Sequence, residues 1–265
     1  SGDRFLKDKL LAQGGKGLFV KELEEALLDN RADAAVHSMK DVPSELPPGL
    51  IIPTICPRDD PFDVLISRKH FTLDELPKHA IIGTASLRRQ AQLLAYRPDL
   101  QIKLLRGNIQ TRLEKLDHGD YDAIILAAAA LDRMNLQHLM TEKLTPPRML
   151  PSCGQGALGI ECREHDSVTH ALLAPLHDQS TSICVYTERR VNGLLGGNCH
   201  VPLAIYCTQD QISQTLTLHV QVMSSDGRTI LSTIHSGLPS EANQLADQAV
   251  SKLRQQGADQ LLSES

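Results

Sequence analysis

The residues best suited to chemistry are basic side chains in the first turn of a predicted helix. Residues 84–89 follow a predicted strand and open a helix, with Ser86 at the capping position and Arg88 and Arg89 directly after it. Positive charge in a first turn opposes the helix dipole, so an anionic ligand at this point would remove the conflict. The alternative interpretation is a pair of solvated arginines without a ligand.

A second strand end repeats this arrangement. Arg106 follows a predicted strand, Asn108 stands at the capping position of the next helix, and Arg112 lies one turn into that helix. Guanidinium groups bind carboxylates and phosphates through paired hydrogen bonds. Because the carboxyl ends of parallel strands face one crevice, we expect four arginines to converge on one polyanionic ligand: Arg88, Arg89, Arg106 and Arg112.

Two further segments contain candidates of a different kind. Lys40 and Asp41 follow a short apolar strand. In a crevice Asp41 would act as a general acid or base or stabilise a cation, whereas on the surface the two residues would form an ordinary ion pair. Lys16 belongs to the loop Gly14–Gly17, whose backbone N–H groups before a helix favour anion binding. The loop lacks the Ser or Thr of a Walker A motif, and its alternative interpretation is a flexible turn.

Cys199 is the best candidate for a reactive thiol. It follows residues 196–198, Gly-Gly-Asn, and precedes His200, and exposure beside a histidine favours thiolate chemistry. Cys153, in the stretch Pro-Ser-Cys-Gly, is the rival exposed thiol, and the alternative for either is an inert cysteine. No two of the 6 cysteines are spaced as C-x-x-C. This spacing argues against a zinc ribbon or a thioredoxin motif, and we expect no metal site.

Alternation of strands and helices in the first part of the chain predicts α/β lobes. Helices are expected at 17–30, 86–96 and 108–117, and strands at 33–36, 50–56, 63–67, 80–84, 101–105, 122–128 and 156–162. Continuous apolar strands that alternate with helices are typical of parallel sheets covered on both faces. Proline- and glycine-containing stretches at 57–61 and 149–156 predict two crossings, by which the chain leaves one lobe, builds a second and returns.

The last third of the chain has a different pattern. A helix is expected at 183–194 and a closing amphipathic helix at 241–256. Between them, residues 201–207, 215–223 and 228–235 alternate between apolar and polar side chains, as antiparallel strands do. This pattern predicts a small α+β domain.

Composition excludes several classes of protein. The chain has 265 residues and a net charge of −5, with 3% aromatic residues and no Trp, which disfavours general nucleic-acid binding and base stacking. Residues 84–115 nevertheless contain seven basic and two acidic residues, which indicates a localised anion site. The longest apolar run, Ala123–Leu131, is shorter than the roughly 20 residues of a membrane helix. Because Ser1–Leu10 has no apolar signal region, we expect a cytoplasmic protein.

Six motifs occur in the order seen in one enzyme family. The chain resembles porphobilinogen deaminase (hydroxymethylbilane synthase) over nearly its whole length, and several six-residue matches make the resemblance specific. The motifs are GGKGLF at 14–19, VHSMKDVP at 36–43, GTASLRRQ at 83–90, LRGN at 105–108, GQGA at 154–157 and GGNC at 196–199.

The resemblance implies a three-part α/β fold. Two periplasmic-binding-protein-like lobes with doubly wound mixed sheets would span residues 1–56 with 157–175 and residues 62–150. A small C-terminal α+β domain, with a three-stranded antiparallel sheet and helices, would span 179–265 and carry the cofactor cysteine. The strand and helix with which family members begin, and which contribute an arginine and a serine to the site, would precede Ser1.

The resemblance also implies the activity. The family is a transferase of porphyrin and haem biosynthesis that condenses four porphobilinogen molecules head to tail into hydroxymethylbilane and releases ammonia. The reaction uses a covalent dipyrromethane primer, joined by a thioether to a cysteine that matches Cys199. A monomer that binds neither nucleic acid nor membrane, and that passes its product to uroporphyrinogen-III synthase, is expected.

Matching positions suggest a role for each candidate side chain. Asp41 is the expected catalytic residue. Cofactor binding is implied for Cys199, Lys40, Ser38, Thr84, Ser86, Arg88, Arg89, Arg106 and Asp41. Substrate binding is implied for Lys16, Arg106, Arg112 and Arg163.

Two other classes of function compete with the transferase. A non-catalytic two-lobed anion-binding protein would share the lobes and the arginine crevice but would not need Cys199. A nucleic-acid-binding protein would use the basic stretch at 84–115, but the net charge and the scarcity of aromatic residues disfavour it.

Overall fold

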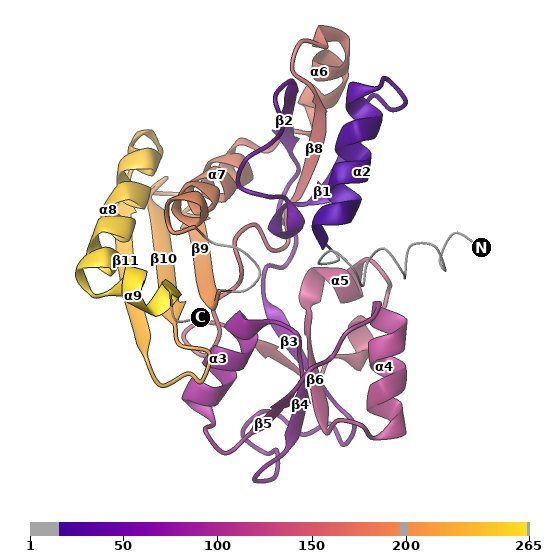
Figure 1. The fold of residues 1–265 in the computed structure, drawn as a ribbon, viewed down its shortest axis with the longest axis vertical. Helices are drawn as coiled ribbons and strands as arrows, with labels where there is room; N and C mark the ends of the chain where they lie inside the picture. The colour runs from indigo at the N-terminus through magenta and orange to yellow at the C-terminus, as the bar shows by residue number, and fades with distance from the viewer. Residues whose placement is uncertain (1–15, 197–200, 264–265) are drawn as a thin grey trace.

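The computed structural model describes residues 16–196 and 201–263, which form three separate sheets and their helices (Figure 1). Two sheets are mixed or antiparallel with helices around them, and the third is a three-stranded antiparallel sheet. The predicted fold class, α/β with a small α+β portion at the C-terminal end, is therefore confirmed. Short 3-10 helices connect the elements: η1 (Met39–Asp41), η2 (Gln137–Leu139), η3 (Ala174–Leu176) and η4 (Pro239–Glu241).

In the first sheet, the strand that comes last in the sequence lies between the other two. Its order is β1 (Ala35–Ser38), β8 (Leu158–Arg163) and β2 (Leu50–Ile55), and β8 runs antiparallel to both neighbours. Helices α2 (Lys16–Leu28) and α6 (Ser167–Leu173) lie beside it. Ser38 pairs with Leu158, so β1 ends where β8 begins. We call this side of the first sheet its crossing edge, because the second crossing enters there.

The second sheet is mixed, and five strands build it in the order β5-β4-β6-β3-β7. The strands are β3 (Asp63–Ser67), β4 (Ile81–Gly83), β5 (Gln101–Lys103), β6 (Ala123–Ala127) and β7 (Glu142–Leu144). Strand β4 is parallel to β5 and β6, but β3 is antiparallel to β6 and β7. The strand pattern favours parallel strands, and β3 departs from it, but the mixed sheet that the resemblance implies is confirmed. The chain enters this sheet at the edge where β6 ends, since Asp63 pairs with Ala127.

Both faces of the second sheet are covered, as its apolar strands predict. Alternate residues of β3 enter two different cores, with Leu65 in one and Val64 and Ile66 in the other. The first core includes Leu93 of α3 and the second includes Leu116 of α4. The helices are α3 (Leu87–Tyr96), α4 (Ile109–His118) and α5 (Ala128–Asp132).

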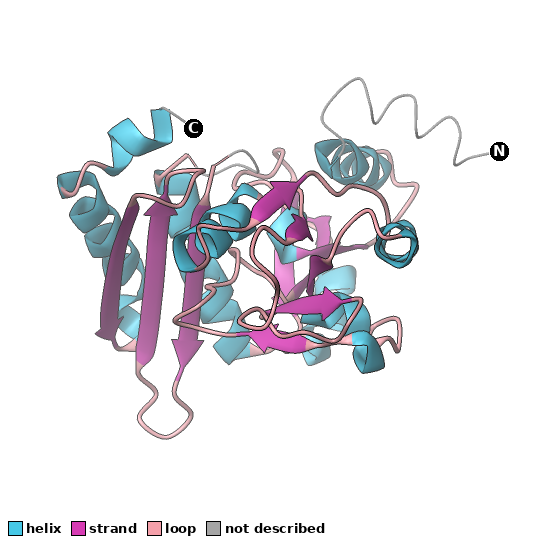
Figure 2. Ribbon diagram, turned by 90° about the horizontal axis from the view of Figure 1, so that it is seen from below, coloured by secondary structure: helices cyan, strands magenta, loops and turns pink. Residues whose placement is uncertain are grey.

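The third sheet is antiparallel in the order β11-β10-β9, and Figure 2 shows its long strands side by side. The strands are β9 (Leu203–Gln209), β10 (Leu216–Met223) and β11 (Ile230–Gly237), and the helices are α7 (Gln179–Leu194), α8 (Ala242–Gln255) and α9 (Ala258–Ser263). Its apolar face packs against these helices through residues such as Leu218, Val191 and Leu253. Helix α7 begins four residues before the predicted start because the Asp178 carboxylate caps it, accepting from the Thr181 N–H at 2.7 Å.

A buried ion pair joins both crossings to the third sheet. Glu188 of α7 is fully buried and pairs with Arg58 of the first crossing at 2.6 Å. The other Glu188 oxygen accepts the Gly154 N–H of the second crossing at 2.6 Å, and Oε1 also accepts the Cys207 N–H of β9 at 2.8 Å. One carboxylate thereby fixes three segments that lie far apart in the sequence.

Within the described ranges, 16–196 and 201–263, every helix is too short or too polar to cross a lipid bilayer.

The Glu188–Arg58 pair gives a testable prediction about stability. We expect Glu188→Gln to lower the free energy of unfolding by about 3–5 kcal/mol, because it leaves the Arg58 guanidinium buried without its counter-charge. Urea denaturation followed by circular dichroism measures this difference. The control is Asp247→Asn at the exposed Arg190 pair, which should cost less than about 1 kcal/mol. Equal decreases in the free energy of unfolding of the two variants would contradict the central role of Glu188.

Candidate active site

The turn η1 places Lys40 and Asp41 at the crossing edge of the first sheet. Met39 between Ser38 and Lys40 is buried, and its N–H donates to the Ala157 carbonyl at 3.0 Å. This anchor leaves Ser38, Lys40 and Asp41 half-buried around the turn. The structure therefore brings these three predicted site residues together.

Gly154 and Gly159 allow the second crossing to approach this turn. A Cβ at Gly154, where φ is +66°, would lie 2.8 Å from the Met39 Cβ. A Cβ at Gly159 would lie 2.2 Å from the Met39 sulfur. A side chain at Gly154 would therefore displace the turn that carries Asp41, because it would also meet the backbone of Met39 and Lys40, whereas one at Gly159 of β8 would first push the Met39 side chain aside.

A buried histidine–carboxylate pair lies behind the turn. His37 Nε2 is 2.8 Å from Glu161 Oε2, and their side chains are 4% and 0% exposed. This pair ties β1 to β8 one residue before Ser38. The other Glu161 oxygen and Oε1 of Glu24 have no hydrogen-bond partner among the residues described. Burial and the negative charge of Glu161 raise the pKa of Glu24.

The start of α3 has the capping geometry that the sequence predicts. The Ser86 hydroxyl accepts from the Arg89 N–H at 3.4 Å, and the Thr84 hydroxyl accepts from the Ser86 N–H at 3.1 Å. Thr84 is buried and Ser86 is half-buried. These contacts fix the backbone at the end of β4 and direct the first turn of α3.

Asp63 neutralises much of the positive charge in that first turn. Its carboxylate accepts from Arg88 Nη2 at 2.8 Å and from Arg89 Nε and Nη2 at 3.0 and 2.8 Å. Gln155 of the second crossing donates a further bond to Asp63 at 3.0 Å. Burial alone would raise the pKa of Asp63, but Arg88 and Arg89 hold it well below its usual range.

This geometry excludes the alternative of two solvated arginines and adds a counter-charge that the sequence interpretation did not include. Asp63 supplies an internal counter-charge, and the backbone carbonyls of Leu150 and Ile125 accept one bond each from Arg88 and Arg89. Two guanidinium groups share one carboxylate, however, so the cluster keeps an excess of positive charge. Cofactor binding by Arg88 and Arg89 stays a prediction.

Arg112 adds an unbalanced cation beside this cluster. Its side chain is half-buried and donates through Nε to the Gly107 carbonyl at 2.8 Å. Burial and the positive charge of Arg89 lower the pKa of Arg112. In the described part of the chain neither Arg112 nor the exposed Arg106 forms an ion pair. An anion near Arg89 and Arg112 would relieve this repulsion. The structure thus brings three of the four predicted arginines, Arg88, Arg89 and Arg112, into one neighbourhood, whereas Arg106 is exposed and its convergence with them stays a prediction.

Arg163 lies away from the other predicted site residues. It ends β8 and pairs with Leu50, whereas Leu158, at the other end of the strand, pairs with Ser38. Five residues of extended strand separate these ends by roughly 16 Å. Arg163 forms ion pairs with Asp33 at 2.7 Å and Asp166 at 2.9 Å. The structure thus gives Arg163 contacts within the first lobe and does not bring it to the crossing edge.

Three candidates need separate mention. Cys199 and the side chain of Lys16 lie outside the residues that the structure describes. Cys153, the rival thiol, packs against the core of the third sheet, and burial followed by the charge of Glu188 raises its pKa above the usual range. A thiol so disfavoured from ionising is a poor nucleophile, which favours Cys199 over Cys153.

Sequence reasoning missed the acidic residues that organise the site. Asp63, Glu161 and Glu188 are each fully buried. A signal for Asp63 and Glu161 was present, because each lies in an otherwise apolar strand, and a buried carboxylate requires a partner. The identity of the partners depends on tertiary contacts and cannot be derived from this signal.

Two family models match the chain. Residues 1–171 match "Porphobilinogen deaminase, dipyromethane cofactor binding domain", and residues 182–255 match "Porphobilinogen deaminase, C-terminal domain". Similar curated relatives include the porphobilinogen deaminases of Legionella pneumophila strain Paris, 58% identical, and strain Philadelphia 1, 57% identical. Each alignment spans 263 residues, 99% of this chain and 85% of the relative.

Solved structures with a detectable likeness include periplasmic proteins. An arginine-specific periplasmic binding protein of Salmonella typhimurium is 15% identical with a TM-score of 0.33, over 60% of this chain and 71% of that one. A YaeC-family lipoprotein of Enterococcus faecalis is 16% identical with a TM-score of 0.38, over 59% of this chain and 76% of that one.

The Asp63 cluster gives a prediction with a defined pH dependence. We expect Asp63→Asn to destabilise the protein by about 3–5 kcal/mol at neutral pH, since it leaves two buried guanidinium groups without a counter-charge. Because the pKa of Asp63 is lowered by folding, its contribution is complete above about pH 5 and is lost as the pH falls below about 4. The difference in urea midpoint between wild type and variant should therefore be constant from pH 8 to about pH 5 and narrow below.

A matched control for this prediction is Asp29→Asn. Asp29 pairs with Arg31 on the surface, and its loss should change stability by less than about 1 kcal/mol. If the difference in urea midpoint between Asp63→Asn and wild type already narrowed between pH 8 and pH 6, a different group would be titrating. That result would contradict the assignment of the pH dependence to Asp63.

Proposed function

This chain belongs to the porphobilinogen deaminase family, and on that premise we propose which of its residues perform the reaction. Its activity is that of a hydroxymethylbilane synthase, a transferase of porphyrin biosynthesis that condenses four porphobilinogen molecules head to tail and releases ammonia. Its cofactor is dipyrromethane.

The main support for this assignment of the site is the positive charge around Arg112, which the Asp63 carboxylate does not balance. Porphobilinogen and the pyrrole units of the cofactor each carry an acetate and a propionate, so their polymer is a polycarboxylate. Arg89, Arg106 and Arg112 present guanidinium groups that a single internal carboxylate, Asp63, does not neutralise. These arginines therefore fit the dipyrromethane cofactor, because its carboxylates are anions that guanidinium groups bind well.

Asp41 is assigned to proton transfer and charge stabilisation. As an acid it gives a proton to the aminomethyl nitrogen of porphobilinogen, and the carbon–nitrogen bond breaks to release ammonia. The Asp41 carboxylate then stabilises the cation left on the substrate. When the free α carbon of a pyrrole forms the new carbon–carbon bond, Asp41 accepts the proton lost from that carbon and returns to its acid form. When bound, dipyrromethane supplies the first such pyrrole carbon.

The remaining candidates are assigned to holding carboxylates and the cofactor. We assign Cys199 as the thioether anchor. The polar side chains at the crossing edge of the first sheet and at the start of α3 are assigned to the cofactor: Ser38, Lys40, Thr84, Ser86, Arg88 and Arg89. Lys16, Arg106 and Arg112 are assigned to substrate carboxylates. Arg163 keeps a substrate role only if the first lobe rearranges, since its present contacts are Asp33 and Asp166.

The proposed lobes follow the three sheets. Residues 1–56 with 157–175 form the first lobe, 62–150 the second and 179–265 the cofactor-carrying domain, with hinges at the two crossings. Chain growth in one site requires the lobes to shift, because each added pyrrole must vacate the reacting position. The hydrogen bond from Arg58 Nε to the Gln155 carbonyl, 2.9 Å, makes the two crossings move together.

The setting of the reaction is also part of the proposal. We place the enzyme in the cytoplasm as a monomer, with its product passed to uroporphyrinogen-III synthase. Thioether formation needs a reduced thiol at Cys199, which a reducing compartment supplies.

The cofactor assignment predicts a covalent adduct. The intact mass of protein purified from cells that make porphobilinogen should exceed the sequence mass by one dipyrromethane, and Cys199→Ser should abolish this increment. Cys153→Ser is the matched control and should retain the adduct, since Cys153 is packed against the third core. Retention of the adduct in Cys199→Ser would contradict the anchor.

The proposed anion site predicts that the loss of Arg112 lowers activity without lowering stability. Arg112→Gln should lower kcat/KM by about 10- to 100-fold, the effect of losing a charge-assisted hydrogen bond. Its free energy of unfolding should not fall, because the substitution removes repulsion with Arg89. Steady-state kinetics and urea denaturation measure the two quantities. The control Arg228→Gln, at an 88% exposed side chain in the third domain, should leave both unchanged. Normal kinetics in Arg112→Gln would exclude it from the substrate site.

A further inference from the structure

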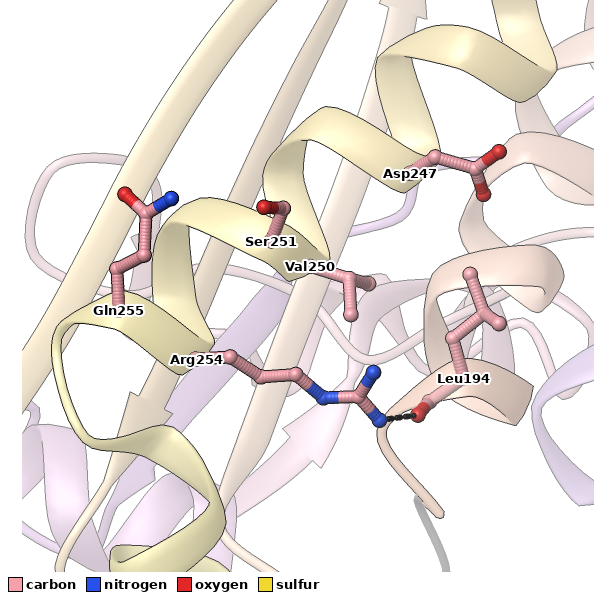
Figure 3. Close-up of a pocket in the computed structure, with 6 residues that line it drawn as sticks. All are labelled: Leu194, Asp247, Val250, Ser251, Arg254 and Gln255. Carbon is pink, nitrogen blue, oxygen red and sulfur yellow. Dashed lines mark hydrogen bonds between the residues drawn. The ribbon is translucent and has the colours of Figure 1, made fainter.

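The C-terminal end of α7 obtains its positive charge from another helix. Its last turn contains no basic residue, although the carbonyl groups there carry the negative end of the helix dipole. Arg254, in the last turn of α8, reaches across and donates through Nη2 to the Leu194 carbonyl at 2.8 Å (Figure 3). Leu194 is the final residue of α7, so this bond holds the point at which the helix ends.

Arg254 is itself held in place. Its Nε donates to Asp259 of α9 at 3.2 Å, so the guanidinium group connects three helices. The side chain is 48% exposed, and its removal therefore leaves the hydrophobic core intact. Arg254 is thus a peripheral clamp and not a packing residue.

A second polar contact joins the same two helices one turn earlier along α7. Arg190 forms a two-bond ion pair with Asp247 at 2.8 and 2.9 Å. Asp247 and Arg254 lie two turns apart on α8 and both line a groove of about 500 Å³ between the helices (Figure 3). The two contacts resemble each other in exposure and in the helices they join. They differ in position, because only Arg254 binds the residue where α7 ends.

The backbone directly after Leu194 is closely constrained. Leu195 is buried in the third core, and Gly196 adopts a φ of +63° while its N–H donates to the Gly193 carbonyl at 3.1 Å. At the return of the chain, Val201 packs against the same core and its carbonyl accepts from the Leu203 N–H at 2.8 Å. The core therefore holds both ends of the connection from α7 to β9, and the Arg254 bond adds a polar anchor to one end only.

We propose that Arg254 is a positioning residue for the cofactor cysteine. Cys199 follows Leu194 by five residues, so the clamp sets the starting point of the segment that presents the thiol. The proposal rests on the proposed role of Cys199 as anchor. In the proposed function the chain attached to Cys199 lengthens with each condensation, so the segment that carries it needs a fixed starting point. Arg254 provides that starting point through its bond to the end of α7.

The test compares Arg254→Gln with the matched control Arg190→Gln. Backbone hydrogen exchange, followed by mass spectrometry on peptides covering 190–203, reports the stability of the segment in the full chain. We expect Arg254→Gln to raise exchange at Leu195 and Gly196, whose N–H groups donate to Val191 and Gly193, by about threefold or more, as the loss of a favourable helix-end cation implies. Arg190→Gln should leave exchange at these amides unchanged, and Arg254→Lys, which retains a cationic donor, should restore most of the protection. Equal exchange in Arg254→Gln and wild type would overturn the proposal, as would an equal increase in Arg190→Gln.

A second measurement links the clamp to the thiol. In protein made without porphobilinogen, the rate at which iodoacetamide alkylates Cys199 should change by about threefold or more in Arg254→Gln and remain unchanged in Arg190→Gln. The rate of adduct formation after porphobilinogen is added, read from the intact mass, should fall in Arg254→Gln alone. Hydrogen exchange and alkylation can be measured whether or not Cys199 carries the cofactor. They therefore still test the role of Arg254 if Cys199→Ser retains the adduct, a result that would contradict only the anchor. Unchanged alkylation and unchanged adduct formation in Arg254→Gln would overturn the positioning role.

Discussion

The structure depends on a line of buried charges that passes through both crossings. Glu188 of α7 pairs with Arg58, Arg58 donates to the Gln155 carbonyl, and the Gln155 side chain donates to Asp63, which pairs with Arg88 and Arg89. None of these carboxylates tolerates burial without its partner. These contacts connect the third domain to the first turn of α3, and each of them requires its two groups to stay within hydrogen-bond distance. The two crossings are thus joined to each other and to both neighbouring sheets by buried polar contacts.

This arrangement explains how a site can be strongly basic and still fold. Asp63 offsets part of the charge of two arginines within the interior, and Arg112 then contributes a cation that bonds a backbone carbonyl but forms no ion pair with the described residues. In the proposed function, a bound polycarboxylate would complete the neutralisation. Asp41 lies on the opposite lobe, at the end of β1, where Met39 and the close-packed glycines fix its turn. In the proposed mechanism, anion binding and proton transfer are therefore divided between two lobes, and the buried contacts lie on the two crossings that join them.

Much of this organisation follows from local sequence. Ser86 and Asn108 are caps whose side chains bond the helical N–H three residues later, and such contacts depend only on neighbouring residues. The sequence predicts a strand at 122–128, but β6 ends at Ala127 and Ala128 begins helix α5, in a run of alanines that favours a helix. The direction of β3, the counter-charge from Asp63 and the remote place of Arg163 depend on how distant segments meet. Periodicity contains no information about these contacts, and Cys199 lies outside the described residues.

The central position of β8 has a consequence for how the chain folds during synthesis. The second sheet is built from one continuous stretch, so all its strands are available once β7 has left the ribosome. The first sheet cannot form at that moment, because β1 and β2 both pair with β8 and not with each other. Among the described strands, β1 and β2 therefore have no partner until roughly a hundred further residues have been translated. The lobe that carries Asp41 is therefore completed around a second lobe that has already folded.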